Sequence, residues 1–114
     1  MRAPKISTKQ RDDVTLVTLA GKLIRRAGAT ALRAVVAGAI DHGCRKMVLD
    51  LSAVTTMDAA GAGELRAAAR SMSNKGGKLR LATLPPNITD LLLILQVIDG
   101  FDSYDTQTEA LASF

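Results

Sequence analysis

Residues 47–63 read MVLDLSAVTTMDAAGAG, and this stretch decides the fold. Its first five residues form a short, mainly apolar run that ends at Ser52, which is typical of a central strand buried on both faces. We expect a short turn to follow, and then a helix over residues 61–75. The apolar side chains of that helix recur on one face, namely Leu65, Ala68, Ala69 and Met72. Asp58 stands in the turn, where its carboxylate is expected to cap the helix.

Two strands and a helix are expected before this stretch. Residues 14–20 are rich in β-branched residues and largely alternate, which predicts a strand with one packed face that ends at Gly21. Residues 5–8 predict a preceding edge strand. Residues 27–41 carry apolar side chains at the spacing of one helical face, and Gly43 follows as a C-terminal cap.

A strand and a third helix are expected after it. The glycine pair at residues 76–77 stops the preceding helix, and residues 78–83 alternate polar with apolar side chains as a strand does. The proline pair at residues 85–86 breaks this strand and offers a preset start for a helix that ends near Gly100. Leu93 falls outside the apolar stripe of that helix.

The remaining residues complete an α/β pattern. Residues 101–104 predict a last short strand, and residues 106–114 predict a terminal helix in which Thr106 and Glu109 form a capping box. Two initial strands followed by alternating helices and strands indicate right-handed crossovers and helices that cover the sheet. We therefore expect one domain over residues 1–114, with a mixed, mostly parallel central sheet of about 4–5 strands and about 4 helices.

Composition and charge exclude several classes of protein. The chain has 15 lysines and arginines against 11 acidic residues, a net charge of +4, but the basic residues are scattered and aromatic residues make up only 3%. Binding to nucleic acid is therefore not expected. The single cysteine, Cys44, forms no internal disulfide, which suits a reducing compartment. The longest apolar run, residues 91–95, is too short to span a bilayer, so we expect a cytoplasmic protein without membrane insertion.

Groups suited to catalysis are scarce. Catalysis needs a nucleophile beside a base, a metal site, or paired carboxylates with separated pKa values. His42 is the single histidine and precedes Gly43, where it complements the C-terminal end of a helix. Asp50 and Asp58 suggest a metal-binding pair; alternatively, Asp50 bonds the loop and Asp58 caps the helix. We expect no enzyme activity, no metal and no cofactor.

A family resemblance rests on the central stretch and its surroundings. Residues 50–52 read DLS and residues 58–63 read DAAGAG. This resembles the STAS signature, in which a buried strand ending Asp-Leu-Ser leads through an apolar turn into Asp-Ser-Ser-Gly-Leu-Gly at a helix start. Gly21, the GGKLRL of residues 76–81 and the DGF of residues 99–101 also fit. The chain is identified as a member of the STAS domain family, of the anti-sigma factor antagonist type.

The resemblance implies a function in partner switching. In that family an unmodified antagonist binds an anti-sigma factor with serine kinase activity, and phosphorylation of the second serine of the motif ends the complex. Ala60 matches that position and follows Ala59, and alanine has no hydroxyl to accept a phosphoryl group. The resemblance therefore implies a non-catalytic binding module that stays like the unmodified state. Thr55 and Thr56 either substitute as phosphoacceptors or simply fill the turn.

The expected partner-binding surface also includes a basic loop. Arg25 and Arg26 follow Ile24, where the family usually has an acidic residue, and they either pair with acidic groups of a partner or form a solvated loop. The expected partner is an anti-sigma factor or a related regulatory protein, and a homodimer is compatible with this interpretation. The resemblance implies a surface made of Thr55, Thr56, Asp58, Ala59, Ala60, Gly61, Arg25 and Arg26.

Two other functions remain open from the sequence. One is a STAS accessory subunit of a transport system, which would dock on a transporter ATPase. The other is a sensor of a small ligand or nucleotide, because the turn at residues 58–61 could receive an anion at the start of a helix.

Overall fold

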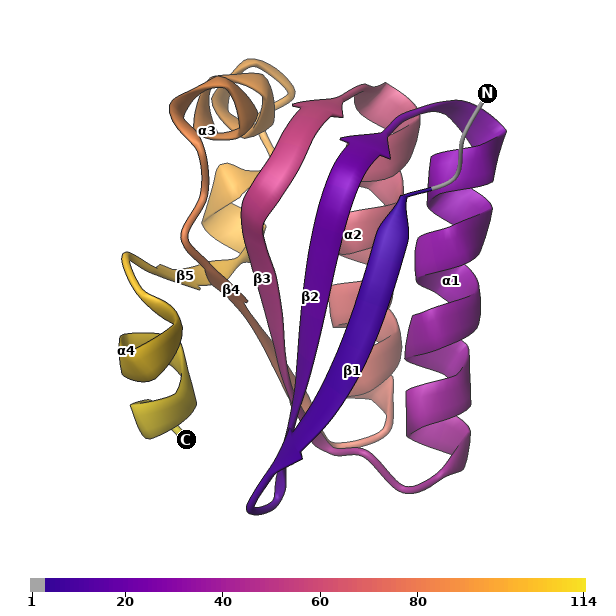
Figure 1. The fold of residues 1–114 in the computed structure, drawn as a ribbon, viewed down its shortest axis with the longest axis vertical. Coiled ribbons are helices and arrows are strands. Elements are labelled where there is room, and N and C mark those ends of the chain that lie inside the picture. Colours follow the sequence, from indigo (N-terminus) through magenta and orange to yellow (C-terminus); the bar gives the residue numbers. More distant parts are fainter. Residues whose placement is uncertain (1–3) are drawn as a thin grey trace.

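The computed structural model describes residues 4–114 as a five-stranded sheet with helices on both sides (Figure 1). The strands are β1 (Lys5–Arg11), β2 (Val14–Leu23), β3 (Lys46–Met57), β4 (Lys78–Ala82) and β5 (Asp102–Tyr104). The helices are α1 (Arg25–Asp41), α2 (Ala59–Asn74), α3 (Pro86–Ile94) and α4 (Gln107–Ala112), with a 3-10 turn at Ile98–Gly100. The strands lie in sequence order, with β1 antiparallel to β2 and all other neighbours parallel. The predicted α/β class and mixed, mostly parallel sheet are confirmed.

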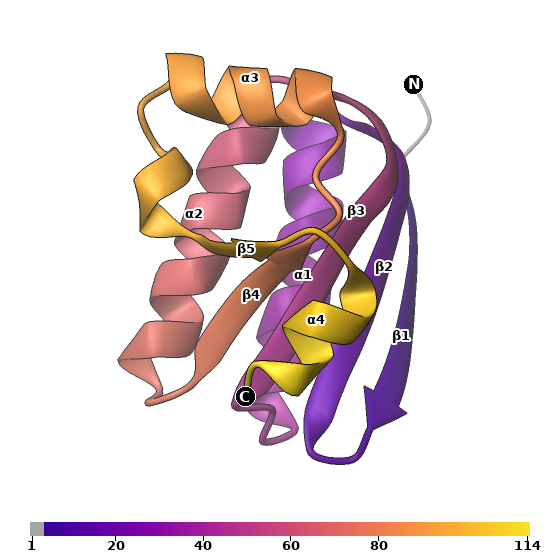
Figure 2. The ribbon, with the colours of Figure 1, turned by 90° about the vertical axis from the view of Figure 1, so that its left-hand side faces the viewer.

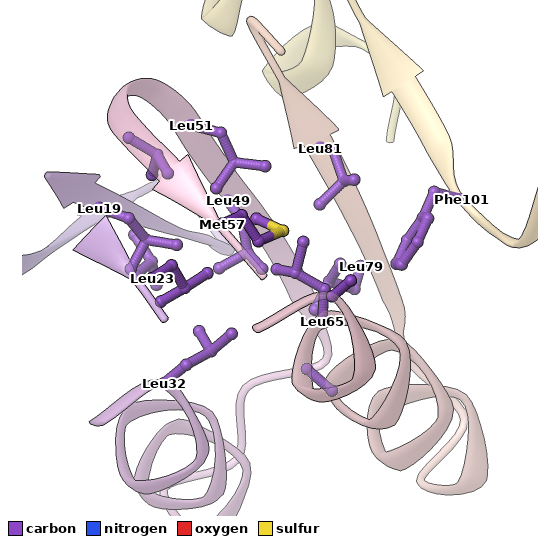
Figure 3. Packing of buried hydrophobic residues seen from close by; sticks show 14 of the residues in the cluster. Leu19, Leu23, Leu32, Leu49, Leu51, Met57, Leu65, Leu79, Leu81 and Phe101 are labelled. Atoms are coloured by element: carbon purple, nitrogen blue, oxygen red, sulfur yellow. The ribbon is translucent and has the colours of Figure 1, made fainter. Parts of the chain in front are cut away.

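The main core lies between the sheet and the helices α1 and α2. Leu32 from α1 and Leu65 from α2 point toward Leu19, Leu49 and Leu81 on the sheet, and all five side chains are fully buried (Figure 3). Burying one leucine contributes about 1.5–3 kcal/mol. The third helix, α3, lies across the end of the sheet at which β3 finishes (Figure 2).

Strand β3 is longer than expected. We expected the strand to end before Ser52 and a turn to follow, but β3 continues to Met57. Relative to β2 it gains one residue within residues 50–53 and another within residues 54–56, so it contains two bulges. Each extra residue interrupts the alternation that identifies a strand in a sequence, and this is why residues 52–57 resembled a turn.

The bulges set which side chains of β3 face the core. Leu51, Val54 and Met57 are all buried in the main core although they are three residues apart. A regular strand would point them alternately to opposite faces. The backbone N–H of Ser52 donates to Oδ1 of Asp50 at 2.9 Å, which confirms that the Asp50 carboxylate bonds the adjacent backbone.

The opposite face of the sheet is covered in part by α4 (Figure 2). Thr106 caps this helix by accepting a hydrogen bond from the N–H of Glu109 at 3.1 Å, as predicted. The next residue, Gln107, donates from Nε2 to Oδ2 of Asp50 at 2.7 Å. Asp50 is only 7% exposed, so this bond joins α4 to the centre of the sheet.

The alternation of β4 was a poor guide to its exposure. Arg80 occupies a polar position of the pattern, yet it is only 8% exposed. Its guanidinium pairs with Asp102 at 3.0 Å, donates to the carbonyl of Ser113 at 3.3 Å and stacks on the Phe114 ring, with 4.5 Å between Cζ and the ring centre. The C-terminal residues after α4 therefore cover the face of β4 on which Arg80 lies.

A residue in the left-handed backbone conformation follows three of the helices and ends them. Gly43 and Gly76 have φ values of +93° and +79° and follow α1 and α2, as predicted. The third helix ends at Ile94 rather than near Gly100, because Gln96 adopts φ +59° and Val97 N–H donates back to Leu92 C=O at 3.0 Å. A non-glycine residue at this position gives no signal in the sequence.

Among the helices of residues 4–114, none combines the length and apolar character that crossing a bilayer requires.

Two leucine substitutions test the position of the core. Leu49 is fully buried and Leu93 is 54% exposed. Leu49→Ala should lower the free energy of unfolding by about 2–5 kcal/mol because it leaves a cavity, whereas Leu93→Ala should change it by less than about 0.5 kcal/mol. Urea unfolding followed by circular dichroism measures both. Equal losses for the two variants would contradict this packing.

Candidate functional site

The candidate site lies where β2 and β3 end and where α1 and α2 begin (Figure 1). The ends of parallel strands that point toward helix starts commonly form binding sites. Contacts across this end bring together the predicted residues of two separate segments. They are Arg25 and Arg26 at the start of α1, Thr55 and Thr56 on β3, the N-cap Asp58, and Ala59, Ala60 and Gly61 of α2.

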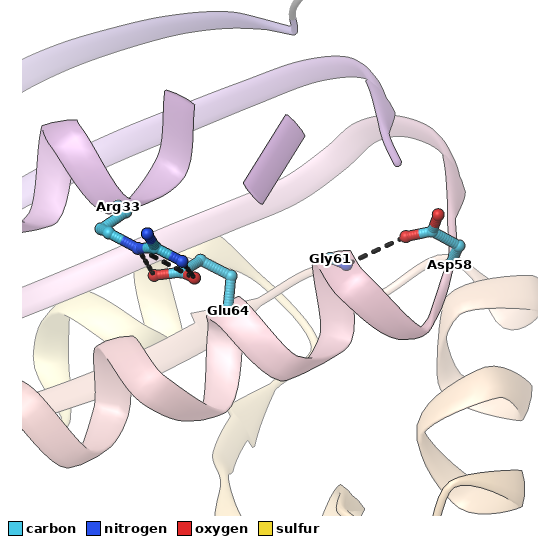
Figure 4. A network of polar contacts seen from close by, with 4 residues as sticks. All are labelled: Arg33, Asp58, Gly61 and Glu64. Atoms are coloured by element: carbon cyan, nitrogen blue, oxygen red, sulfur yellow. Dashed lines mark hydrogen bonds and ion pairs between the residues drawn. The ribbon is translucent and has the colours of Figure 1, made fainter. Parts of the chain in front are cut away.

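Asp58 connects the starts of two helices. Its Oδ1 accepts a hydrogen bond from the N–H of Gly61 at 3.0 Å, which confirms its predicted role as the cap of α2 (Figure 4). Its Oδ2 accepts from the N–H of Arg25 at 2.8 Å, a contact across 33 residues that the sequence did not indicate. One carboxylate therefore satisfies free N–H groups at the starts of both α1 and α2.

These donors also control the ionisation of Asp58. Partial burial is the largest single influence and acts to raise the pKa of Asp58. The N–H groups of Gly61, Arg25 and Ala60 oppose it and together hold the pKa of this carboxyl below its ordinary value. Asp58 is therefore an anion fixed in place by backbone donors, which suits a structural cap better than a proton-transfer group.

Two glycines allow the helices to approach the end of β2. A side-chain carbon on Gly61 would collide with the carbonyl oxygen of Leu23, and one on Gly28 of α1 would lie 2.9 Å from the Leu23 carbonyl carbon. Both helices therefore pack directly on the backbone of Leu23. Gly61 belongs to the quoted motif, whereas the sequence analysis missed Gly28.

The first turn of α2 presents a small, neutral surface. Ala59 and Ala60 are exposed, while Gly61 and Ala62 behind them are buried. Neither alanine side chain has a group that could donate or accept a hydrogen bond or be modified. This turn can therefore contribute shape to an interface but no chemistry.

The two threonines lie on β3 and not in the expected turn. Both are exposed, and the hydroxyl of Thr55 donates to the Gly21 carbonyl at 3.2 Å. The carbonyl of Thr55 accepts from Nδ2 of Asn87 at 3.0 Å. Asn87, on α3, was missed by the sequence analysis because this contact joins residues 32 apart.

Arg25 and Arg26 are the first residues of α1, whereas we expected the helix to start at Ala27 after a basic loop. Arg25 has φ +57°, and its bond to Asp58 holds it in this uncommon conformation. Both arginines are exposed, as is Lys22 just before them, and none of the three forms an ion pair within residues 4–114. They form a basic rim beside the alanines of α2.

An apolar patch borders the same end of the molecule. Leu93 and Ile94 on α3 are 54% and 76% exposed, and α3 lies across this end (Figure 2). A basic rim, two exposed alanines and two exposed aliphatic side chains are features of a protein-docking surface.

An ion pair that was not predicted from the sequence joins α1 to α2 next to the candidate site. Arg33 of α1 holds Glu64 of α2 through both its Nε and Nη2 atoms, with an Nη2–Oε2 distance of 2.9 Å (Figure 4). Glu64 is only 8% exposed, and its hydrogen bonds and charge raise the pKa of Arg33. The pair fixes α1 and α2 against each other, and its sole sequence signal was an acidic residue beside an apolar stripe.

The groups with catalytic potential are not arranged for catalysis. His42 and Cys44 follow the far end of α1, where Nδ1 of His42 bonds the Gly38 carbonyl at 2.8 Å. Asp50 and Asp58 each bond their own neighbours, as in the second of the two interpretations above. Over residues 4–114, no three or more histidine, cysteine or acidic side chains gather as a metal site would require.

Comparison with known proteins gives a consistent result. A family model described as the STAS domain matches residues 5–110. A Bordetella bronchiseptica protein named anti-sigma factor antagonist BtrV is 26% identical over 110 residues, which are 96% of this chain and 94% of that protein. A crystal structure of an anti-sigma factor antagonist from Thermotoga maritima has a TM-score of 0.86 at 24% identity and covers 94% of this chain and 92% of its own. A sulfate transporter family protein from Wolinella succinogenes has a TM-score of 0.78 at 21% identity, with 90% and 84% covered. Both of these solved structures share the fold of this chain.

Two glycine substitutions in α2 test the close packing. Gly61→Ala should destabilise the protein by more than about 2 kcal/mol, because the added methyl group must displace the Leu23 backbone. A side-chain carbon on Gly63 meets nothing within 4 Å, so Gly63→Ala should stabilise the helix by about 0.5–1 kcal/mol. Thermal and urea unfolding distinguish the two. Stabilisation by both substitutions would show that α2 does not pack on Leu23.

Acid titration tests the cap. Asp58→Ala should cost about 0.5–2 kcal/mol at neutral pH, and Asp58→Asn should cost less because asparagine is also a good cap. Because folding lowers the pKa of Asp58, its ionised form favours the folded state. This contribution is fully present above the ordinary pKa of about 3.9 and is lost as the pH falls through the folded-state value. Wild type should therefore lose more stability than Asp58→Asn on acidification, and parallel stability profiles would refute the assignment.

Proposed function

This chain belongs to the STAS domain family, and we propose that it is a non-catalytic binding module of a partner-switching system, with an anti-sigma factor or a related regulatory protein as its partner. One observation carries the proposal. Ala60 stands exposed in the first turn of α2, at the position that the family signature gives to the phosphorylated serine.

The chemistry of that position explains the consequence. A phosphoserine carries about −1.5 to −2 charges at neutral pH and opposes docking on an apolar or acidic surface. Alanine accepts no phosphoryl group, so the surface of Ala59 and Ala60 stays neutral. The module is then a constitutive binder, and any control of the complex must act at another place.

The surrounding surface supports one kind of partner. The basic rim of Lys22, Arg25 and Arg26 suits an acidic rim on the partner, where complementary charge speeds association and restricts orientation. The exposed Leu93 and Ile94 suit an apolar contact next to it. Thr55 and Thr56 lie within the same surface, and Thr56 is the better substitute phosphoacceptor because the Thr55 hydroxyl already bonds Gly21.

The alternatives have less support. A sensor of an anionic ligand at the start of α2 would need free N–H donors, but Asp58 already occupies those of Gly61 and Arg25 with its own negative charge. A transporter subunit is supported by a shared fold with one transporter family protein. A neighbouring transporter ATPase gene, rather than a neighbouring sigma factor gene, would favour that second function.

Substitutions at Ala60 test the proposal. Incubation with the neighbouring kinase-like anti-sigma factor and ATP should leave the mass of the wild-type chain unchanged, whereas Ala60→Ser should gain one phosphate. Ala60→Glu should weaken binding to that partner at least about tenfold, equivalent to about 1.4 kcal/mol, by adding charge within the interface. Ala112→Glu, an exposed alanine on α4, serves as the matched control and should bind normally. Stoichiometric phosphorylation of the wild type, or equal binding by both glutamate variants, would refute the proposal.

A further inference from the structure

Strand β1 has a free edge. Among residues 4–114 it pairs with β2 alone, and it lies at one side of the sheet (Figure 1). In an antiparallel pair alternate residues bond the neighbouring strand, so the other residues of β1 direct their N–H and C=O groups away from the sheet. With seven residues, β1 offers an unpaired edge roughly 23 Å long.

A groove accompanies that edge. It has a volume of about 670 Å³ and lies between β1 and α1, lined on the strand side by Thr8 and Gln10. On the helix side, Val35, Gly38 and Ala39 are half-buried and mainly apolar. The lining also includes the carboxylate of Asp13, whose charge is paired with Lys46 at 2.6 Å. The other lining residues are Thr15, Ala34, His42, Gly43 and Cys44. Gln10 is held in place because its Oε1 accepts from the Thr15 hydroxyl at 3.0 Å. The groove is therefore preformed, with a mainly apolar helix face opposite polar side chains of the strands.

The opposite face of β1 is basic. Side chains alternate along a strand, so Lys5, Lys9 and Arg11 point away from the face that carries Thr8 and Gln10. All three are exposed, and none forms an ion pair within residues 4–114. Pairing of two β1 edges would bring these like charges together, which disfavours a second copy of the chain as the occupant.

We infer that the β1 edge and its groove bind an extended acidic segment of another protein, which adds to the sheet as a sixth strand. Backbone groups of the segment would pair with β1, and alternate side chains would enter the groove, as in strand addition generally. These side chains must be small and apolar to fit beside Val35 and Ala39. The side chains between them must be acidic to face Lys5, Lys9 and Arg11.

This site is separate from the proposed partner surface. The residues that line the groove extend to the β1–β2 turn and to the end of α1. The site around Asp58 lies at the start of α1, which is at the opposite end of that helix (Figure 1). Basic residues on an edge strand also prevent aggregation. Prevention of aggregation requires no groove, whereas binding of an extended segment does. Filling the groove therefore distinguishes the two roles of β1.

Peptide binding tests the inference directly. The probes are capped nine-residue peptides with a fluorescent label: one alternates glutamate with valine, one alternates lysine with valine, and one is the glutamate peptide with alternate backbone nitrogens methylated. The glutamate peptide should bind the full chain with a dissociation constant on the order of 0.1 mM, and this binding should weaken as salt is added. The lysine and methylated peptides should bind at least about tenfold more weakly, because they lose charge complementarity and backbone pairing.

Matched variants locate the site. Gly38 lines the groove, and a side-chain carbon added there meets nothing within 4 Å. Gly38→Leu should therefore place its side chain in the groove and weaken binding of the glutamate peptide at least about tenfold while the chain stays folded. Gly63→Leu, at an equally open helical glycine on α2, should bind as wild type does. Lys9→Glu should weaken binding and Lys75→Glu should not.

Several results would overturn the inference. These are the absence of binding to wild type at millimolar peptide, equal binding by Gly38→Leu and Gly63→Leu, and a dimer in sedimentation that Lys9→Glu disrupts. None of these results bears on binding at Ala60, so the two proposals can fail independently.

Discussion

The backbone of Leu23 is the point on which the arrangement of this molecule depends. The starts of α1 and α2 both pack on it, and each does so through a glycine, Gly28 and Gly61, because a methyl group would collide there. The Asp58 carboxylate then ties the two helix starts together through their N–H groups. Because these contacts are close and directional, they fix the starts of α1 and α2 relative to each other.

Buried polar groups follow the same logic throughout residues 4–114. Asp50 joins the β3 bulge to α4, Glu64 joins α2 to α1, and Arg80 fixes the C-terminal residues on β4. An unpaired buried charge would cost several kcal/mol, so each of these groups is held by partners, although Nε of Arg80 lacks one. The buried polar groups therefore serve structure, and the free charges lie on the surface, where they can serve recognition.

Exposed charge and exposed apolar surface are unevenly distributed. At the helix starts, the basic rim lies beside alanines and the exposed aliphatic residues of α3. Along β1, exposed lysines accompany an open strand edge and a groove. The two regions differ in the interactions they offer. The helix starts offer shape and charge, and the edge of β1 offers backbone hydrogen bonds.

The sequence by itself determined the order of the elements, the caps at Asp58 and Thr106, the glycine ends of α1 and α2, and the motif by which the family is identified. These features are local, because a cap or a periodic face is encoded within a few residues. Only the tertiary structure decided the bulges of β3, the end of α3 at Gln96, the burial of Arg80 and the bond between Asp58 and Arg25. Most of these depend on partners 20 or more residues away, which impose their geometry on a sequence that does not specify it locally. The candidate site was thus predictable in its residues, whereas its shape was set by contacts between distant segments.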